Sequence, residues 1–218
     1  MIVDANQAIE LKARQRLGAF LLRHGRVYSG KSRWTQAHFR WLESLTMPTS
    51  VQQIVLQEYV DVVIQTQHRV ANLTQQMRAA LASWSLRPVV ECLMALRGVQ
   101  RVTAMTILAE LGDLTRFESP AQLMAFLGLV PSEHSTGSSR RQGAITKTGN
   151  GHVRRVLVEA AWAYRFPARK SRIIQRRAEL TPPGIQAIAW KAQQRLCARY
   201  RHLIEAGKVK NQATTAVA

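Results

Sequence analysis

The chain has 218 residues, which is enough for one or two domains with a buried core. Its 31 Lys and Arg against 13 Asp and Glu give a net charge of +18, and the excess is uneven. Residues 131–218 hold 17 basic and 4 acidic side chains (+13), whereas residues 1–130 carry only +5. This balance excludes an acidic surface and indicates a polyanionic partner, with nucleic acid favoured over an anionic membrane or a merely solvated surface.

Membrane insertion and secretion are not indicated. No apolar run approaches the length of a spanning helix, and the N-terminal stretch lacks the apolar core of a signal peptide. Cys92 and Cys197 are single and far apart, so they offer neither a disulfide framework nor a metal-ligand spacing. We therefore expect a protein of the reducing cytoplasm, with no membrane partner.

Residues 1–87 are predicted to form a helical linker and coiled-coil segment. An amphipathic helix is expected over 4–23 and a short helix over 35–45, with Tyr28 and Trp34 between them interpreted as docking side chains rather than as platforms for bases. The apolar positions of the first helix are Ile9, Leu11, Leu17, Phe20, Leu21 and Leu22.

A long helix is expected from Thr49 or Ser50 to about Trp84, after the break at Pro48. Its apolar residues alternate in threes and fours, as in a coiled-coil strand. They are Val51, Ile54, Val55, Tyr59, Val62, Val63, Val70, Leu73, Met77, Ala80 and Leu81. So long a helix with one stripe needs a partner, so a hairpin or a coiled coil that mediates self-association is favoured over a single core helix.

Residues 88–207 are predicted to form a second domain that opens with a helix-hairpin-helix-like element. Two short helices, 89–96 and 102–111, flank a turn over 97–101. Arg97, Arg101 and Thr103 are candidate phosphate contacts, because such hairpins present backbone N–H groups and cations to nucleic acid. The usual second Gly of the turn is replaced by Gln100, which leaves a plain αα-hairpin nearly as well supported.

The stretch 131–150, PSEHSTGSSRRQGAITKTGN, is rich in Ser, Gly and cations. It is predicted to be a polar loop, neither a helix nor a core strand. Hydroxyl groups beside free backbone amides, with Arg140, Arg141 and Lys147 close in sequence, suit the binding and attack of a phosphate. On this composition alone, a connector that only binds phosphate is favoured over one that carries a nucleophile.

Helices follow this loop to the end of the domain. Over 153–164, Arg154 and Arg155 lie off the apolar side, and a basic stretch over 165–178 leads to a last helix, 184–206. Lys191, Arg195 and Arg199 share one face of that helix, where they repel one another unless a polyanion neutralises them. Residues 208–218 are expected to be a frayed tail. The fold class is therefore predicted to be all-α.

Three segments together resemble a known family: LRGVQRVTAMTILAELGDLTRFESPAQLMAFLGLVPSEHS (96–135), RRQGAITKTGNGHVRRVLVEAAW (140–162) and AIAWKAQQRLCARYRHL (187–203). They are similar to the C-terminal transposase domain of the DEDD-type, Piv/MooV-like insertion-sequence transposases, the insertion-sequence family numbered one hundred and ten. Upstream, RLGAFLLRHGRVYSGKSRWTQAHFRWL (16–42) resembles the linker region of the same family.

The resemblance implies a recombinase that acts on DNA in a bacterial cytoplasm, close to the nucleoid, and is guided by an RNA that the element encodes. It also implies a serine nucleophile that forms a covalent link to DNA. Ser135 fits that position best, with Ser132, Ser138 and Ser139 as alternatives. Other expected nucleic-acid contacts are Arg97, Arg101, Thr103, Arg140, Arg141, Lys147, Arg154, Arg155, Lys191, Arg195 and Arg199.

The sequence departs from the family in one respect. Full-length members carry an N-terminal RuvC-like domain whose acidic residues bind Mg²⁺, and no pair of acids at metal-ligand spacing is visible here. No cofactor is therefore expected in this chain. We expect a truncated chain or one half of a split gene, inactive alone, with a non-catalytic nucleic-acid-binding module or modulator of intact transposase as the alternative.

Overall fold

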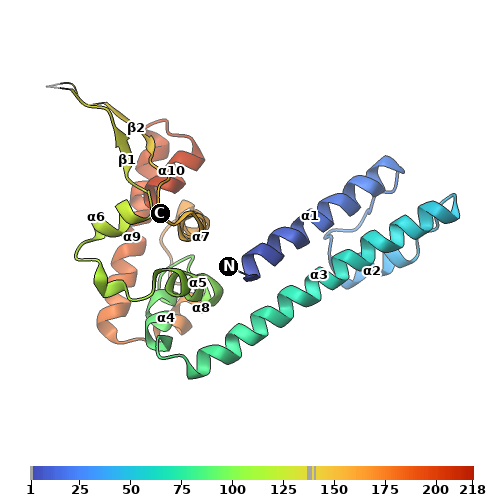
Figure 1. Cartoon of the computed structure of the whole chain (residues 1–218), viewed down its shortest axis with the longest axis horizontal. Helices are drawn as coiled ribbons and strands as arrows, with labels where there is room; N and C mark the ends of the chain where they lie inside the picture. The colour runs from blue at the N-terminus through green and yellow to red at the C-terminus, as the bar shows by residue number, and fades with distance from the viewer. Residues whose placement is uncertain (1, 137–138, 140) are drawn as a thin grey trace. The chain divides into compact units, whose positions relative to one another are not determined.

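The computed structural model describes residues 2–136, 139 and 141–218. The chain divides into two compact units, Met1–Ala80 (unit 1) and Leu81–Ala218 (unit 2), so the division falls a few residues before the predicted boundary at 87/88. Helices dominate both units, and the described residues form only two short strands (Figure 1). The predicted all-α class is confirmed.

Unit 1 contains α1 (Ile2–Arg23), α2 (Gln36–Glu43) and nearly all of α3 (Ser50–Ser83). The side chain of Thr35 caps α2 and that of Thr49 accepts from the amide of Gln52 at the start of α3. Helices α1 and α3 lie side by side and run in opposite directions (Figure 1). Their shared core consists of Ala13, Leu17, Phe20, Leu21, Leu42, Met47, Leu56, Val60 and Val63.

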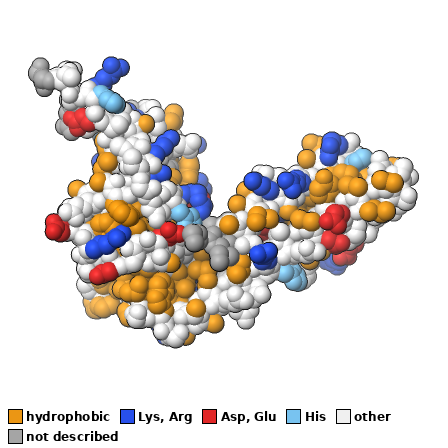
Figure 2. Space-filling view, in the orientation of Figure 1, with side chains coloured by type: hydrophobic (Ala, Val, Ile, Leu, Met, Phe, Trp, Pro, Cys, Tyr) orange, Lys and Arg blue, Asp and Glu red, His pale blue; other side chains and the backbone are white. Residues whose placement is uncertain are grey.

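The predicted helices of unit 1 are confirmed, but the predicted apolar stripes are partly wrong. Within unit 1, Leu56, Val60 and Val63 are the buried positions of α3, whereas Val51 and Ile54 are each 68% exposed. In α1, three predicted positions (Ile9, Leu11 and Leu22) are exposed as well. Both helices carry apolar residues on more than one side, and the packing of α1, α2 and α3 decides which side is buried. Figure 2 shows apolar side chains on the surface of unit 1.

Aromatic rings surround one buried histidine in unit 1. The rings of Tyr28, Trp34 and Trp41 lie 4.7, 5.0 and 5.5 Å from that of His38, measured between centroids. The amide of Trp34 donates to Nδ1 of His38 at 3.1 Å. These contacts support the interpretation of Tyr28 and Trp34 as docking side chains.

Unit 2 is built from short helices. They are α4 (Arg87–Met94), α5 (Arg101–Leu111), η1 (Leu114–Arg116), α6 (Pro120–Phe126), α7 (Gly151–Ala161), η2 (Trp162–Arg165), α8 (Arg172–Ala178), α9 (Pro183–Glu205) and α10 (Lys210–Val217). One core joins α5, α7 and the chain after α6 through Ile107, Leu127 and Val153. A second joins α7, η2, α9 and α10 through Ala161, Tyr164 and Tyr200.

The expectation of an irregular loop over 131–150 is wrong in part. Strands β1 (Pro131–Glu133) and β2 (Gln142–Ile145) pair antiparallel, with Pro131 opposite Ile145, Glu133 opposite Gln142, and an irregular register between them. An isolated bridge joins Thr136 to Ser139 farther along. The two strands contain Pro, Glu, Gly and Ala, which are depleted in strands, so the composition did not indicate that their backbone groups pair. The strands are exposed, as expected of a segment outside the core.

The expectation of a frayed tail after Gly207 is also wrong. Helix α10 buries Ala213, Thr214 and Val217 against α7 and α9. Small residues at these positions allow close packing of a helix that has little apolar surface of its own.

Candidate functional site

The β1–β2 hairpin is attached to unit 2 through several contacts at its base. The amides of Thr146 and Lys147 donate to the carbonyls of Val130 and Gly128, at 2.9 and 3.1 Å. Nη1 of Arg154, on α7, donates to the carbonyls of Leu127 and Thr148, at 2.7 and 2.9 Å. Gly149 has a φ of +71°, and a Cβ there would clash with the carbonyl oxygen of Phe126. The hairpin therefore starts from a closely packed base.

Ser135 lies just beyond β1 and is exposed. Its Oγ donates to Oε1 of Glu133 at 2.8 Å and accepts from the amide of Arg141 at 3.2 Å. The hydroxyl group is thus positioned by one residue from each side of the hairpin, next to a carboxylate that can accept its proton.

The other candidate serines have different surroundings. Ser132 is half-buried, and a Cβ at the facing Gly143 would clash with its Oγ. Ser139 is exposed, and its backbone exchanges two hydrogen bonds with Thr136. Ser138, like Arg140, lies outside the described residues.

Glu133 was missed by the sequence analysis. Residues two apart in an extended chain point to the same side, so the spacing of Glu133 and Ser135 could have suggested their contact. Inferring that contact required knowing that the chain is extended here, and the composition of the segment did not indicate a strand.

A polar cluster links the start of α7 to α5. Asn150 caps α7 by accepting from the amide of Val153 at 2.9 Å and donates its Nδ2 to Oε2 of Glu110 at 3.0 Å. Nδ1 of His152 lies 2.9 Å from Oε1 of Glu110. The hydrogen bonds from Asn150 and then His152 hold the pKa of Glu110 below its ordinary value.

Four of the predicted nucleic-acid contacts have partners within unit 2, namely Arg97, Arg154, Arg155 and, on α9, Arg199. Arg97 donates to the carbonyl of Pro167 at 2.8 Å, and Arg154 makes the two bonds at the hairpin base. Arg155 pairs with Glu159 at 2.8 Å on the exposed side of α7. Their proposed contacts with phosphate stay predictions, but each already has a partner in the fold.

The remaining predicted contacts lie nearer to solvent. Arg141 and Lys147 are exposed on the hairpin and at its base, and Lys147 has a φ of +59°. On α9, Lys191 and Arg195 are exposed, as is Arg199, whose Nε donates to the carbonyl of Ala216 at 3.4 Å. The predicted contacts on α9 therefore lie on a different element from those on the hairpin and are distant from them in sequence.

The α4–α5 hairpin carries Arg101 and Thr103, both half-buried in the first turn of α5. Gly98 in the turn has a φ of +87°, and a Cβ there would clash with the carbonyl oxygen of Ala160 at the end of α7. The turn thus packs against α7 on that side. The two predicted helices are present, and a helix-hairpin-helix role stays a prediction.

Two absences hold for the residues that the structure describes. Their His, Cys, Asp and Glu side chains form no group of three or more that could hold a metal ion. None of their helices combines the length and hydropathy that a membrane span requires.

Part of this helical unit is similar to known transposases. Residues 90–175 match the Transposase IS116/IS110/IS902 family. The match begins in α4 and ends in α8, so it includes the β1–β2 hairpin with Ser135. This segment of the chain is therefore similar to the IS116/IS110/IS902 transposase family.

Similarity to individual proteins extends beyond that segment. The chain is 46% identical over 205 residues to y4qE of Sinorhizobium fredii, described as a transposase, covering 94% of this chain and 49% of the relative. It is 31% identical over 200 residues to the transposase for insertion sequence element IS1533 of Leptospira borgpetersenii, covering 87% and 56%. A shorter match, 41% over 66 residues, is to the transposase for IS1111A of Coxiella burnetii and covers 30% and 18%. The chain thus spans about half the length of the first two relatives.

Proposed function

We propose that this chain acts in DNA transposition, where it binds DNA and an element-encoded guide RNA and supplies Ser135 as the nucleophile for strand cleavage and exchange. The observation that carries the proposal is the position of Ser135 Oγ, which is exposed and 2.8 Å from a carboxylate oxygen of Glu133. The similarity to transposases and the +13 charge of residues 131–218 support a DNA substrate.

The chemistry at Ser135 is phosphoryl transfer. The Oγ attacks a backbone phosphorus, a new O–P bond forms, and the bond from phosphorus to one strand oxygen breaks. The serine proton passes to Glu133, and the departing oxygen takes a proton from solvent. Reversal by a second strand oxygen restores the serine and joins the new strand. The amide of Arg141, 3.2 Å from Oγ, helps to fix the direction of attack.

Cations on the same segment would stabilise the charge that develops on the phosphate. Arg141 and Lys147 are exposed there, and Arg140 is adjacent in sequence. A guanidinium group can hold two phosphoryl oxygens at once, which suits a transition state with spread negative charge.

The acidic metal site that the family resemblance implies is not assigned to this chain, and no step above runs through a metal. We propose that a RuvC-like domain supplies it and that recombination requires both parts. The covalent step at Ser135 is the part of the chemistry that this chain can be tested for directly.

The test is a covalent trapping assay with element-end DNA and guide RNA, with and without a separately produced RuvC-like domain from a relative. We expect a protein–DNA adduct on a denaturing gel that disappears in Ser135→Ala and persists in Ser139→Ala, the matched exposed serine of the same hairpin. An adduct that survives Ser135→Ala would remove the nucleophile assignment.

Glu133→Gln tests the proton acceptor. The amide keeps an oxygen that can accept the serine hydrogen bond but cannot take up a proton at neutral pH. We expect adduct formation to fall by about 10²-fold, in the range of general base catalysis, and its dependence on pH to change. An unchanged rate of adduct formation with an unchanged pH profile would show that Glu133 only stabilises the hairpin.

A second function is favoured by one observation: both hydrogen-bonding roles of Ser135 are filled within the hairpin, as in a structural serine. In that case the chain is a non-catalytic nucleic-acid-binding module or a modulator of intact transposase. Salt-sensitive binding of DNA without any adduct, in the presence of the added domain, would support this function.

Self-association through α3 is proposed as well. Val51 and Ile54 are exposed on α3, next to the half-exposed Val55, although the core of unit 1 already covers Leu56, Val60 and Val63. Ile54→Glu should then shift the chain to a smaller mass in light scattering coupled to gel filtration. A monomeric wild-type chain would contradict this proposal.

A further inference from the structure

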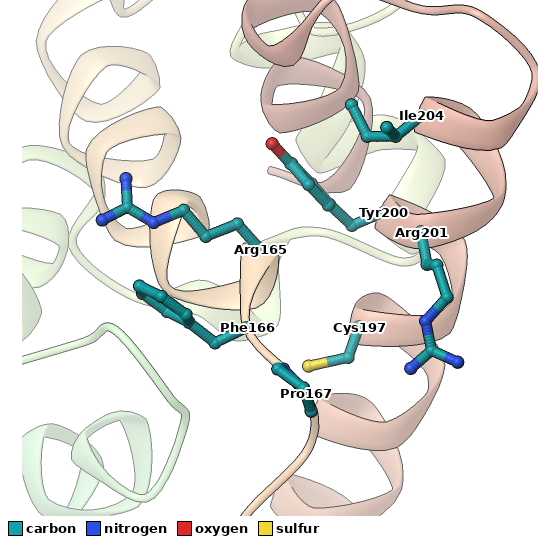
Figure 3. A pocket seen from close by; sticks show the side chains of 7 residues that line it. All are labelled: Arg165, Phe166, Pro167, Cys197, Tyr200, Arg201 and Ile204. Carbon is teal, nitrogen blue, oxygen red and sulfur yellow. The ribbon is translucent and has the colours of Figure 1, made fainter.

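Unit 2 has a small open hollow between α9 and the segment that follows α7 (Figure 3). Its volume is about 170 Å³. The hollow is lined by Arg165, Phe166, Pro167, Cys197, Tyr200, Arg201 and Ile204. Cys197 and Tyr200 are buried and form its inner wall, whereas both arginines are exposed at its rim.

The fold fixes both sides of this hollow. Nη1 of Arg97 donates to the carbonyl of Pro167 at 2.8 Å and lies 3.8 Å from Sγ of Cys197, so it connects the segment after η2 to α9. Burial raises the pKa of the Cys197 thiol, which therefore favours its neutral form. The inner wall is therefore formed by a neutral thiol and an aromatic ring, with Arg97 behind the thiol, and the two arginines of the lining lie at the rim.

An aromatic ring and a guanidinium group, both planar, lie on one side of the opening. Phe166 is 51% exposed, and Cζ of Arg165 lies 4.6 Å from the centroid of its ring and 5.7 Å from that of Trp162. Nucleobases stack on aromatic rings and on guanidinium planes without regard to sequence. Arg165 and Arg201 can also contact phosphate oxygens on either side of a stacked base.

We propose that this hollow takes one unpaired base of a single-stranded nucleic acid, with the flanking phosphates held by Arg165 and Arg201. The inference rests on the proposed function, because it assumes a nucleic-acid partner. The hollow is smaller than the roughly 300 Å³ at which pockets for whole small-molecule ligands begin, so it suits one planar group of a larger molecule. A base inside a duplex could not enter it, since the base is stacked and paired.

The test compares single-stranded DNA, single-stranded RNA and duplex DNA of equal length, each carrying the fluorescent base 2-aminopurine. Phe166→Ala should weaken single-strand binding about 5-fold or more, the lower end for loss of one stacked base, and leave duplex binding unchanged. Whichever of DNA or RNA shows the loss is the strand that supplies the base.

Phe126→Ala is the matched control. Phe126 is 41% exposed and has Cζ of Arg116 at 4.9 Å from its ring centroid, but it lies on α6, outside the hollow. Its replacement should leave both binding constants unchanged. Equal losses for the two Phe variants, or equal losses on single strands and duplex, would overturn the proposal.

Ile204→Trp keeps every charge and narrows the hollow from its rim, so it tests the proposal even if Phe166→Ala unfolds. Single-strand affinity should fall and the fluorescence change of 2-aminopurine should disappear. Unaltered single-strand binding in this variant would exclude the hollow while leaving the proposed function intact. A wild-type chain that binds no nucleic acid at any salt concentration would overturn both.

Discussion

The two units differ in most of their polar contacts, although Arg26 of unit 1 also donates to a backbone carbonyl, that of Thr46, at 3.0 Å. In unit 1, the buried His38 lies among aromatic rings and accepts one hydrogen bond from a backbone amide. In unit 2, arginine side chains reach backbone carbonyls of distant elements: Arg97 to Pro167, Arg154 to Leu127, and Arg177 to Val99. Many cations of the basic unit thus have structural partners, so its charge cannot be counted directly as nucleic-acid contacts.

The largest expected effect tests how closely the elements of unit 2 pack. Gly98→Ala should lower the free energy of unfolding by about 3–4 kcal/mol, because the new Cβ clashes with a backbone carbonyl and the residue has a positive φ. Urea denaturation measures the change. Gly112→Ala is the control: its φ is also positive, but no atom lies within 4 Å of a new Cβ, so about 1 kcal/mol is expected. Equal costs would show that the contact with Ala160 is unimportant.

The second effect tests the internal arginines. Arg154→Ala should cost about 2–3 kcal/mol of unfolding free energy, since two carbonyls lose a charged donor at the hairpin base. Arg155→Ala removes the neighbouring guanidinium group, whose partner Glu159 is exposed, and should cost no more than about 0.5 kcal/mol. If the two variants unfold at the same urea concentration, the two carbonyl bonds of Arg154 contribute no more to stability than the exposed ion pair of Arg155.

The third effect belongs to unit 1 and depends on pH. Burial, and then the charge of Arg33, lower the pKa of His38 from its ordinary value near 6.5. The unfolded chain therefore binds a proton at higher pH than the folded chain. The contribution of neutral His38 to the free energy of unfolding is fully present above about pH 6.5 and declines as the pH falls toward the lowered pKa.

Hydrogen exchange of peptides from residues 1–80, at pH 7.5 and 5.5, would measure this decline after correction for intrinsic rates. His38→Phe should abolish the pH dependence of their opening free energy, whatever it does to absolute stability. The same substitution at His202, exposed in unit 2, should leave the dependence in place. A persistent dependence in His38→Phe would assign it to another group.

The smallest effect on stability is expected on α9. Replacing Lys191 and Arg195 by Ala should leave the unfolding free energy within about 0.5 kcal/mol, because both side chains are exposed. If both contact phosphate, the slope of log affinity against log salt should fall by about 1 for each residue. An unchanged slope would show that α9 lies outside the interface.

The sequence predicted most of the helices of both units because their periodicity and caps are local signals, but it predicted neither α8 nor α10. It did not predict which side of α3 is buried, since Val51 and Ile54 are as apolar as Val60 and only the packing against α1 and α2 decides between them. The strands of the hairpin were missed because their pairing depends on backbone groups at 131–145 and on the packed base, not on strand-forming side chains.

Most residues of the candidate site could be predicted from the sequence, but their contacts could not. Ser135 and the cations around it could be named from the sequence, but the contact with Glu133 requires the hairpin geometry. Arg154 and Arg195 look alike in a sequence, yet one binds carbonyls at the hairpin base and the other is exposed on α9. Arginine suits both roles because its five N–H donors serve carbonyls and phosphates equally well.

The alkylation rates of the two cysteines can report how often the hollow beside α9 opens. Cys92 is half-buried on α4, whereas Cys197 is 4% exposed and its thiol has a raised pKa. Alkylation depends on the thiolate and on access, so a maleimide reagent should label Cys92 first and Cys197 only when the wall opens. The rate at which Cys197 is labelled then measures how often this part of unit 2 opens, without any engineered probe.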